Sequence, residues 1–314
     1  MSATLHLGDC LDVLRTLPDA SVDAVVTDPP YYRVKDEDWD RQWNDPAAFL
    51  AWLDQVAEQW QRVLKPNGSL YCFASPQMAA RVELMLGQRF HVLNSIRWTK
   101  AQGWHEKAEK EALRSYLSPW EAVIFAEQRG DKYAEAEVAL HKQVYAPIGR
   151  VVAIKRLEAG LQRHQVDTAC SPSRKPTGLC YRWEEGACLP TLEQWVDLCQ
   201  VCGDRREYED LRRPFNVTRF DPFTDVWSFR TVQPRPGKHS CEKPQGLLRH
   251  IINSSTRPGA VVLDSFAGSG ATGQACLALG REFIGIERCS HWHRVASRSL
   301  AMIQPDLFTM GTAA

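Results

Sequence analysis

The sequence has no net charge, no long apolar run and no N-terminal pattern of a secretory signal. Its 314 residues include 38 lysines and arginines and 38 aspartates and glutamates. No apolar stretch approaches the roughly 20 residues that a membrane-spanning helix needs. A secretory signal begins with a basic region followed by an apolar stretch, and the first residues show neither. We therefore expect a cytoplasmic protein.

Internal repeats and low-complexity tracts are also absent. With 44% hydrophobic and 24% charged residues, the chain lacks the composition of a disordered protein. Its length is sufficient for one large domain or two smaller ones. Zero net charge also speaks against a nucleic-acid partner, because phosphate binders are usually basic somewhere. That argument depends on how the charge is distributed along the chain.

Short apolar strands alternate with helices in the first part of the chain. The helix expected over 47–64 has apolar residues at helical spacing, and Asn67-Gly68 is expected to turn the chain into the next strand. Helices of this length between short strands predict a mostly parallel sheet covered on both faces. Strands are expected at 4–7, 24–27, 69–74, 90–98 and 122–126, and helices at 12–17, 47–64 and 76–86.

The alternation breaks near Gly130 and resumes after residue 238. Between the two lies an insert at 141–214, with helices expected at 151–159 and 191–201 and a turn-rich stretch at 170–177. A connector at 215–237 is rich in proline and aromatic residues. The sequence thus predicts one α/β domain in two pieces, 1–140 and 238–314, around a mostly helical insert. In the last piece, helices are expected at 243–254, 273–279 and 292–303, and strands at 260–263 and 283–286.

A glycine-rich turn leads from an expected strand into an expected helix near residue 268. Gly268, Gly270 and Gly273 match the dinucleotide fingerprint, and Glu287 follows Gly268 by 19 residues, at the end of the next strand. Glycines let a nucleoside approach the backbone, and the acidic residue suits a ribose diol. Taken alone, this segment has three interpretations: a tight turn that binds no ligand, the cofactor loop of a dehydrogenase, or the cofactor loop of a methyltransferase. Only 41 residues follow Gly273, too few for the second mononucleotide half of a dehydrogenase.

A second motif, Asp28-Pro29-Pro30-Tyr31, directly follows an expected buried strand. In an open parallel sheet, ligands bind at the carboxyl ends of the strands. The two prolines stiffen the backbone, so a carboxylate, a carbonyl and an aromatic ring stay close together. Asp28 and the Pro29 carbonyl can accept the two N–H bonds of a planar aromatic amine, and Tyr31 can stack on its ring.

Taken together, the two motifs resemble those of the amino-group DNA methyltransferases, which act on N6 of adenine or N4 of cytosine. The motif order, with the insert between, resembles the permuted β group, and the resemblance covers residues 4–127 and 238–303. It implies a Rossmann-like, S-adenosylmethionine-dependent methyltransferase fold with a permuted, mostly parallel sheet. It also implies S-adenosylmethionine as the cofactor, double-stranded DNA as the partner and a bacterial or phage-encoded source. Dimers are common in this group, so a homodimer stays open.

The resemblance assigns roles to individual residues. Asp28, Pro29, Pro30 and Tyr31 would hold the target base, flipped out of the duplex. Asp9 would contact the cofactor adenine, Glu287 the ribose, and Lys243 would flank the methionine end. Trp39 would touch the base or the duplex. The full set expected around the cofactor is Asp9, Cys10, Lys243, Asp264, Phe266, Gly268, Gly270 and Glu287.

Asp28 favours adenine N6, because family members that act on cytosine N4 commonly carry serine at this position. Either side chain can accept a bond from an amine, so cytosine N4 stays the alternative. Two other classes also remain: a DNA-binding regulator on a methyltransferase scaffold, and an enzyme that methylates RNA or a protein amide. The intact motifs argue against the regulator, and the large insert suits duplex DNA better than RNA or protein.

The insert is the expected target-recognition region. Its residues 149–190 resemble a helix-turn-helix module, which would read base edges in the major groove through Arg174, Lys175, Thr177 and Arg182. Residues 141–240 hold 16 basic and 12 acidic residues, so zero net charge averages a mildly basic insert and connector with a mildly acidic remainder. The stretch 100–118 is either a DNA-facing loop or a solvated charged face.

Five of the ten cysteines lie in the insert, at Cys170, Cys180, Cys188, Cys199 and Cys202. A chain without a secretory signal is not expected to form disulfides. Zinc sites with four thiolates usually show two tight cysteine pairs, and only the Cys199–Cys202 pair is tight. We therefore expect these cysteines to be small buried residues and predict no metal, with zinc as the alternative.

Overall fold

The computed structural model describes residues 2–34, 37–100, 109–128, 146–203, 213–217, 221–233 and 239–303. The chain divides into two compact units, one formed by Met1–Gln128 with Phe215–Ala314 and the other by Arg129–Pro214. The predicted start of the insert, at residue 141, lies outside the described residues. Within the described part of the chain, no helix is both long and apolar enough to span a membrane.

The first unit is built on an eight-stranded sheet in the order β1-β8-β7-β2-β3-β5-β4-β6. β5 runs antiparallel to both of its neighbours, and all other neighbouring pairs are parallel. The predicted mostly parallel sheet is thus confirmed. The strands are β1 (Ala3–Leu7), β2 (Val22–Thr27), β3 (Leu64–Ala74), β4 (Phe90–Thr99), β5 (Trp120–Gln128), β6 (Val226–Ser228), β7 (Val261–Asp264) and β8 (Glu282–Glu287).

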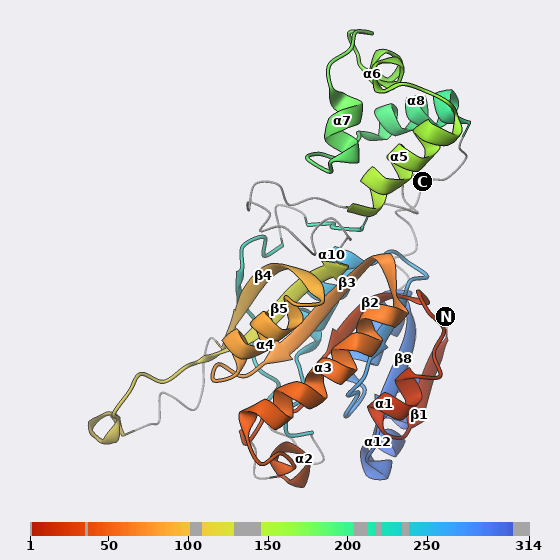
Figure 1. Cartoon of the computed structure of the whole chain (residues 1–314). Coiled ribbons are helices and arrows are strands. Elements are labelled where there is room, and N and C mark those ends of the chain that lie inside the picture. The colour runs from red at the N-terminus through yellow and green to blue at the C-terminus, as the bar shows by residue number, and fades with distance from the viewer. Residues whose placement is uncertain are drawn as a thin grey trace. The chain divides into compact units, whose positions relative to one another are not determined.

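Helices cover both faces of this sheet (Figure 1). One face carries α1 (Cys10–Leu14), α3 (Pro46–Val63) and α4 (Ala79–Leu86), and the other carries α10 (Gln245–Ser255), α11 (Ala271–Ala278) and α12 (Ser290–Ala301). Two short helices, α2 (Asp38–Arg41) and the 3-10 helix η2 (Lys110–Ala112), lie in connections. The layers follow from strands that are apolar on both faces.

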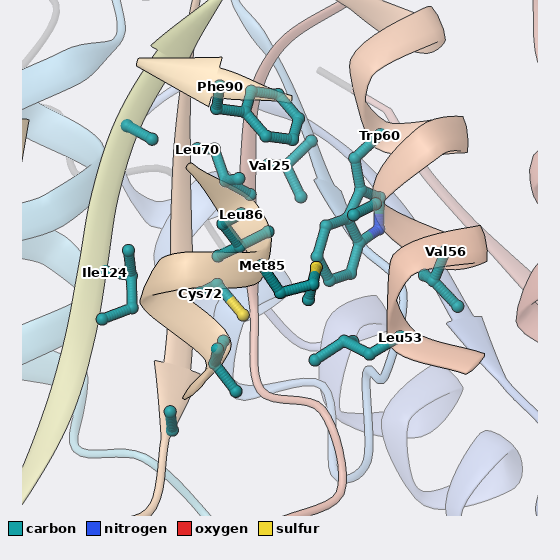
Figure 2. Packing of buried hydrophobic residues seen from close by; sticks show 14 of the residues in the cluster. Val25, Leu53, Val56, Trp60, Leu70, Cys72, Met85, Leu86, Phe90 and Ile124 are labelled. Atoms are coloured by element: carbon teal, nitrogen blue, oxygen red, sulfur yellow. The ribbon is translucent and has the colours of Figure 1, made fainter. Parts of the chain in front are cut away.

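The long helix α3 confirms the helix that the spacing of apolar residues predicts over 47–64. Asp45 caps its N-terminus by accepting from the Ala48 N–H at 2.8 Å, and Pro46 occupies the first turn. The apolar residues on one side of the helix, including Leu53, Val56 and Trp60, are fully buried. Figure 2 shows Leu53, Val56 and Trp60 in one cluster with side chains of β2, β3, α4 and β5. Helical spacing of apolar residues thus places α3 on the sheet.

The structure corrects three local expectations. Asn67-Gly68 is not a turn, because β3 begins at Leu64 directly after α3. Gly68 fits inside the strand since a Cβ atom there would lie 2.5 Å from Leu64 and 3.0 Å from the carbonyl oxygen of Asp23. The predicted connector contains β6, which pairs with β4. The predicted helix at 76–86 begins only at Ala79.

The second unit is helical in its described part, as predicted. Its helices are α5 (Ala146–Glu158), α6 (Arg163–Cys170), α7 (Leu179–Glu184) and α8 (Leu192–Cys202). Helix α6 was not expected from the sequence, since between Arg163 and Cys170 it buries few apolar side chains. The core of this unit consists of Val152, Val166, Cys170, Cys180, Trp183, Trp195 and Leu198.

Candidate active site

The carboxyl ends of β2 and β7 lie side by side, because the two strands are parallel neighbours. Asp28 follows β2 directly, and Asp264 is the last residue of β7. Loops at such strand ends form the usual ligand site of an open parallel sheet, and here they border a cavity of about 450 Å³. Most residues singled out in the sequence line it: Asp9, Cys10, Asp28, Pro29, Pro30, Tyr31, Lys243, Asp264, Phe266, Gly268 and Glu287.

Asp28 and Lys243 form a buried ion pair in the cavity wall. Nζ of Lys243 donates to Oδ2 of Asp28, and the Lys243 and Asp28 side chains are only 8% and 18% exposed, respectively. Burial raises the pKa of Asp28, and the ammonium group opposes the rise. Burial would lower the pKa of Lys243, but the charges of Asp28 and Glu121 raise it above its ordinary value. The resemblance placed Lys243 beside the cofactor, whereas its ammonium group contacts the carboxylate of the Asp-Pro-Pro-Tyr motif.

The second oxygen of Asp28, Oδ1, is buried and has no hydrogen-bond partner among the described residues. Buried carboxylate oxygens are nearly always hydrogen-bonded. This orphaned acceptor therefore suits an N–H donor from a bound ligand, such as an aromatic amine.

Tyr31 is held by Glu121, a residue that no sequence motif predicts. Oε2 of Glu121 accepts from the Tyr31 hydroxyl at 2.9 Å, and Oε1 accepts from Nζ of Lys100 at 2.6 Å. Nζ of Lys243 lies 3.5 Å from Oε2. Burial would raise the pKa of Glu121, but Lys243 and Lys100 lower it to about 2. Glu121 is therefore a carboxylate at neutral pH.

The glycine loop after β7 is tied to β8 through Glu287. The two carboxylate oxygens of Glu287 accept from the backbone N–H groups of Gly268 at 2.8 Å and Cys289 at 2.7 Å. Burial raises the pKa of Glu287, and these bonds oppose the rise. Gly268 has φ +52°, and a Cβ atom there would lie 3.4 Å from the ring of His239. The loop thus offers bare backbone and one acidic side chain to the cavity.

Gly270, which the resemblance assigned to the cofactor site, does not line the cavity. It precedes α11 with φ +80°, and a Cβ atom there would lie 3.0 Å from Cβ of Ala296 in α12. At Gly273, a Cβ atom would lie 2.7 Å from Leu300 and from Phe283. These two glycines let α11 pack closely on its neighbours. The cofactor role that the resemblance implies for Gly270 stays a prediction.

The loop that follows Tyr31 is fastened by Asp40, which is fully buried. Its Oδ1 accepts from the Tyr31 N–H at 2.7 Å and its Oδ2 from the Val34 N–H at 2.6 Å. Between them, Tyr32 and Arg33 both have φ +59°, a region that residues other than glycine rarely adopt. Asp40 therefore compensates backbone strain directly beside the Asp-Pro-Pro-Tyr motif. Trp39 belongs to the same short helix, α2, but its side chain lies outside the described residues.

Several functional candidates have no signal in the sequence motifs. In Asp38-Trp39-Asp40, nothing in the sequence distinguishes the role of Asp40 from that of Asp38. For Glu121 the only signal is an acidic residue at the start of an apolar strand. Other cavity-lining residues that were not predicted include Trp52, Glu242 and Trp292.

The four residues proposed to read DNA all lie in the second unit and are exposed. Three of them, Arg174, Lys175 and Thr177, lie between α6 and α7, and Arg182 lies on α7. Asp167 of α6 fixes this connection, because its carboxylate accepts from the N–H groups of Gly178 at 2.8 Å and Cys180 at 2.7 Å. Of the stretch 100–118, residues 101–108 lie outside the described residues.

The cysteines of the second unit serve its core. Cys170 and Cys180 are buried, and the other three pack against the same cluster. In the described ranges, no group of three His, Cys, Asp or Glu side chains could hold a metal ion.

Known proteins are similar to this chain in sequence and in fold. The chain is 27% identical over 301 residues to the DNA adenine methyltransferase YhdJ of Escherichia coli (strain K12), covering 95% of this chain and 82% of that protein. The M1.HpyAVI–SAM complex superposes with a TM-score of 0.55 at 19% identity, covering 96% of this chain and 100% of that one. For the cytosine-N4-specific PvuII DNA methyltransferase the values are 0.56 and 14%, with coverages of 95% and 86%.

Both structural neighbours confirm the expected methyltransferase fold. A family model described as a DNA methylase, N6_N4_Mtase, matches residues 22–298, which include both motifs and the insert between them. The resemblance drawn from the two motifs is thus confirmed, and the chain belongs to the N6/N4 DNA methylase family.

Proposed function

We propose that this protein transfers a methyl group from S-adenosylmethionine to the exocyclic N6 of an adenine flipped out of duplex DNA. The observation that carries this proposal is that one cavity is lined by both the Asp-Pro-Pro-Tyr motif and the glycine loop with Glu287. An amine acceptor and a nucleoside-binding loop therefore border the same space. A base inside a duplex cannot present its amine to such a cavity, so it must leave the stack.

The residues on the cofactor side fit S-adenosylmethionine, which M1.HpyAVI binds in its solved complex. Glu287 offers carboxylate oxygens for the ribose hydroxyls, and Gly268 leaves room for the ligand next to the backbone. Asp9 and Phe266 line the same cavity and would contact the remainder of the nucleoside. When bound, the cofactor supplies a sulfonium methyl group, which is a strong electrophile.

The residues of the Asp-Pro-Pro-Tyr motif make the amine reactive. An exocyclic amine is a poor nucleophile, because its lone pair is delocalised into the base. Asp28 Oδ1 and the Pro29 carbonyl would accept its two N–H bonds and favour pyramidal geometry at nitrogen. These bonds strengthen as positive charge develops on nitrogen, so they act mainly in the transition state. Tyr31, fixed through its hydroxyl by Glu121, would stack on the base and hold the amine in line.

Adenine is favoured over cytosine by Asp28 and by the relative YhdJ, which is named an adenine methyltransferase. Cytosine N4 is the alternative, because the PvuII enzyme shares the fold. The test is to incubate the protein with duplex DNA and S-adenosylmethionine and to measure modified nucleosides by mass spectrometry. We expect N6-methyladenine, and none with Asp28→Ala. N4-methylcytosine without N6-methyladenine would overturn the choice of base, and no modified base with any duplex would overturn the activity.

We also propose that the second unit recognises the target sequence. Support comes from the exposed residues Arg174, Lys175, Thr177 and Arg182, and from the way Asp167 fixes the connection before α7. Arg182→Ala is expected to weaken binding of the methylated sequence by roughly tenfold or more and to relax its specificity. Arg298→Ala, an exposed arginine on α12, is the control. Equal effects of both substitutions would contradict a role in recognition.

A further inference from the structure

Two carboxylates and two ammonium groups form a cluster of ion pairs at the Asp-Pro-Pro-Tyr motif. They belong to Asp28, Lys100, Glu121 and Lys243, whose side chains are between 8% and 24% exposed. Lys243 contacts both carboxylates, and Lys100 contacts that of Glu121. Asp28 and Lys243 belong to motifs that the sequence singles out. Glu121 lies on β5 and belongs to no such motif.

The position of Lys243 bears directly on how Asp28 can act. Its ammonium group donates to Oδ2 of Asp28 and lies 3.5 Å from Oε2 of Glu121. It also lies 5.1 Å from the centre of the Tyr31 ring and 4.9 Å from that of Phe73. An ammonium group pairs more tightly with one carboxylate when no second carboxylate competes for it. Glu121 therefore limits how strongly Lys243 can neutralise Asp28.

Glu121 also fixes the aromatic ring that would stack on the base. Its Oε2 accepts from the Tyr31 hydroxyl at 2.9 Å, and Lys100 holds the opposite oxygen at 2.6 Å. Because both oxygens of Glu121 are engaged, its carboxylate has one orientation. A single side chain thus sets both the charge balance at Asp28 and the direction of Tyr31.

We propose that Glu121 is a positioning residue for methyl transfer, which keeps Asp28 available to the target amine by sharing Lys243 and holds Tyr31 against the base. This inference rests on the proposed function, since it concerns the same amine-binding pocket. Glu121 acts through Lys243 and Tyr31 and needs no contact of its own with the substrate.

Removing a negative charge and removing a positive charge from this cluster should shift the pKa of Asp28 in opposite directions. The titratable groups that face Asp28 include Lys243, Glu121 on β5, Tyr31, Cys72 on β3 and Asp264 on β7. Removing the negative charge of Glu121 lowers the pKa of Asp28, because a like charge is lost. Removing the positive charge of Lys243 raises it. A merely structural role for Glu121 would not produce this pair of opposite shifts.

The experiment compares Glu121→Gln with Glu127→Gln in the full-length protein. Glu127 is the matched control, because it is a buried carboxylate on the same strand, pairs with His91 and does not line the cavity. For Glu121→Gln we expect kcat to fall about tenfold or more, with the KM for S-adenosylmethionine unchanged. The acid limb of the kcat/KM profile should move to lower pH. Glu127→Gln should leave kcat and this limb as in the wild type.

Two further variants make the result decisive. Lys243→Met should move the acid limb to higher pH. Lys100→Met should do the same, because Glu121 without Lys100 competes more strongly for Lys243 and so leaves Asp28 less neutralised. Lys100 is the most exposed of the four side chains. If Glu121→Gln does not fold, the Lys100→Met shift decides alone. Equal behaviour of Glu121→Gln and Glu127→Gln, or shifts in the same direction for Glu121→Gln and Lys243→Met, would overturn the inference. An inactive wild type would instead overturn the proposed function.

Discussion

The hydroxyl of Thr27 donates to Oδ1 of Asp264 at 2.9 Å and accepts from the backbone N–H of Ser265 at 3.2 Å. Thr27 is the last residue of β2 and Asp264 the last of β7, so this contact joins the two motifs where their strands end. The residues are 237 positions apart in the sequence. The contact fixes the distance between the amine-binding turn and the glycine loop.

Thr27→Val should destabilise the protein by about 1–3 kcal/mol, because the buried Ser265 N–H loses its acceptor and the buried Asp264 carboxylate loses one of its donors, while it keeps the Phe266 N–H. The control is Ser69→Ala on β3, since the Ser69 hydroxyl is buried and has no hydrogen-bond partner among the described residues. Its removal should change stability by less than about 0.5 kcal/mol. Urea unfolding of the two variants measures the difference, and a Thr27→Val protein as stable as Ser69→Ala would contradict the assigned role.

Because of Asp264, the stability of the folded protein should decrease as the pH rises. Burial raises its pKa from 3.8 to about 6, so the folded state binds a proton that the unfolded state has already released. Stability is then lost between about pH 4 and pH 6, by up to roughly 3 kcal/mol at about 1.4 kcal/mol per pKa unit. Asp264→Asn removes this loss, so its stability relative to the wild type should increase over that range.

Asp54→Asn is the control of opposite sign for the Asp264 experiment. The hydrogen bonds of Arg89 lower the pKa of Asp54, so the wild-type carboxylate gains stability as the pH rises through its folded pKa. Relative to the wild type, Asp54→Asn should therefore become less stable as the pH rises. Denaturant unfolding of both variants between about pH 2 and pH 7 checks the two slopes, because the Asp54 effect falls below the unfolded pKa and the Asp264 effect above it. Slopes of the same sign in the two variants would be incompatible with the burial of Asp264.

Much of this fold could be predicted, because apolar periodicity marks helices such as α3 and buried strands such as β2. The missed elements lack that signal. Strand β6 has only three residues and owes its existence to pairing with β4. Helix α6 is largely polar, and its Val166 and Cys170 are anchored by partners that the sequence does not show. The Asn67-Gly68 dipeptide is typical of a turn, but tertiary packing holds it in β3.

The candidate site shows the same division. Asp28 and the glycine loop carry dense local patterns, and both line the cavity as expected. Glu121 reaches Tyr31 across 90 residues of sequence, and this contact exists only because the antiparallel β5 brings its start to the carboxyl end of β3. The fingerprint alone could not separate Gly268, which lines the cavity, from Gly270, which lets α11 pack on α12.

Gly270→Ala should destabilise the protein more than Gly259→Ala. The two glycines have nearly the same φ, +80° and +81°, so alanine suffers the same backbone strain at both. At Gly270 the new Cβ atom would lie 3.0 Å from Cβ of Ala296, whereas at Gly259 no atom lies within 4 Å. We expect about 1 kcal/mol for Gly259→Ala and roughly 1–3 kcal/mol more for Gly270→Ala. Thermal unfolding measures both, and equal losses would mean that α12 moves aside without cost.

Asp40→Asn should loosen the loop after Tyr31. Asparagine keeps one acceptor oxygen but replaces the other with a donor, so either the Tyr31 or the Val34 N–H loses its partner. The amide protons of 31–34 should exchange faster with solvent, and kcat should fall while the affinity for S-adenosylmethionine is unchanged. Asp45→Asn is the control, because asparagine caps α3 as well as aspartate. Unchanged exchange in Asp40→Asn would refute the fastening role.

Glu184→Gln should destabilise the second unit, because Glu184 joins three of its helices. Its Oε1 accepts from Nε of Arg156 on α5 at 2.5 Å, and its Oε2 from Nε of Arg163 at the start of α6 at 2.6 Å, with only 3% of the side chain exposed. The substitution would leave two arginines facing a neutral amide, at a cost of about 2–4 kcal/mol. The exposed pair Lys155–Glu158 gives the control, and Glu158→Gln should cost less than about 0.5 kcal/mol.

The pH dependence provides a second measurement for Glu184. Burial would raise its pKa, but the two arginines lower it below the ordinary value. The ion pairs therefore stabilise the unit above the unfolded pKa, and this contribution is lost as the pH falls through the folded pKa. Hydrogen exchange of α7 amides in the full-length chain, measured from pH 7 downward, should show protection that decreases in the wild type and is already low in Glu184→Gln. Equal protection in both proteins at pH 7 would show that packing around Trp183, without these ion pairs, holds α7 in place.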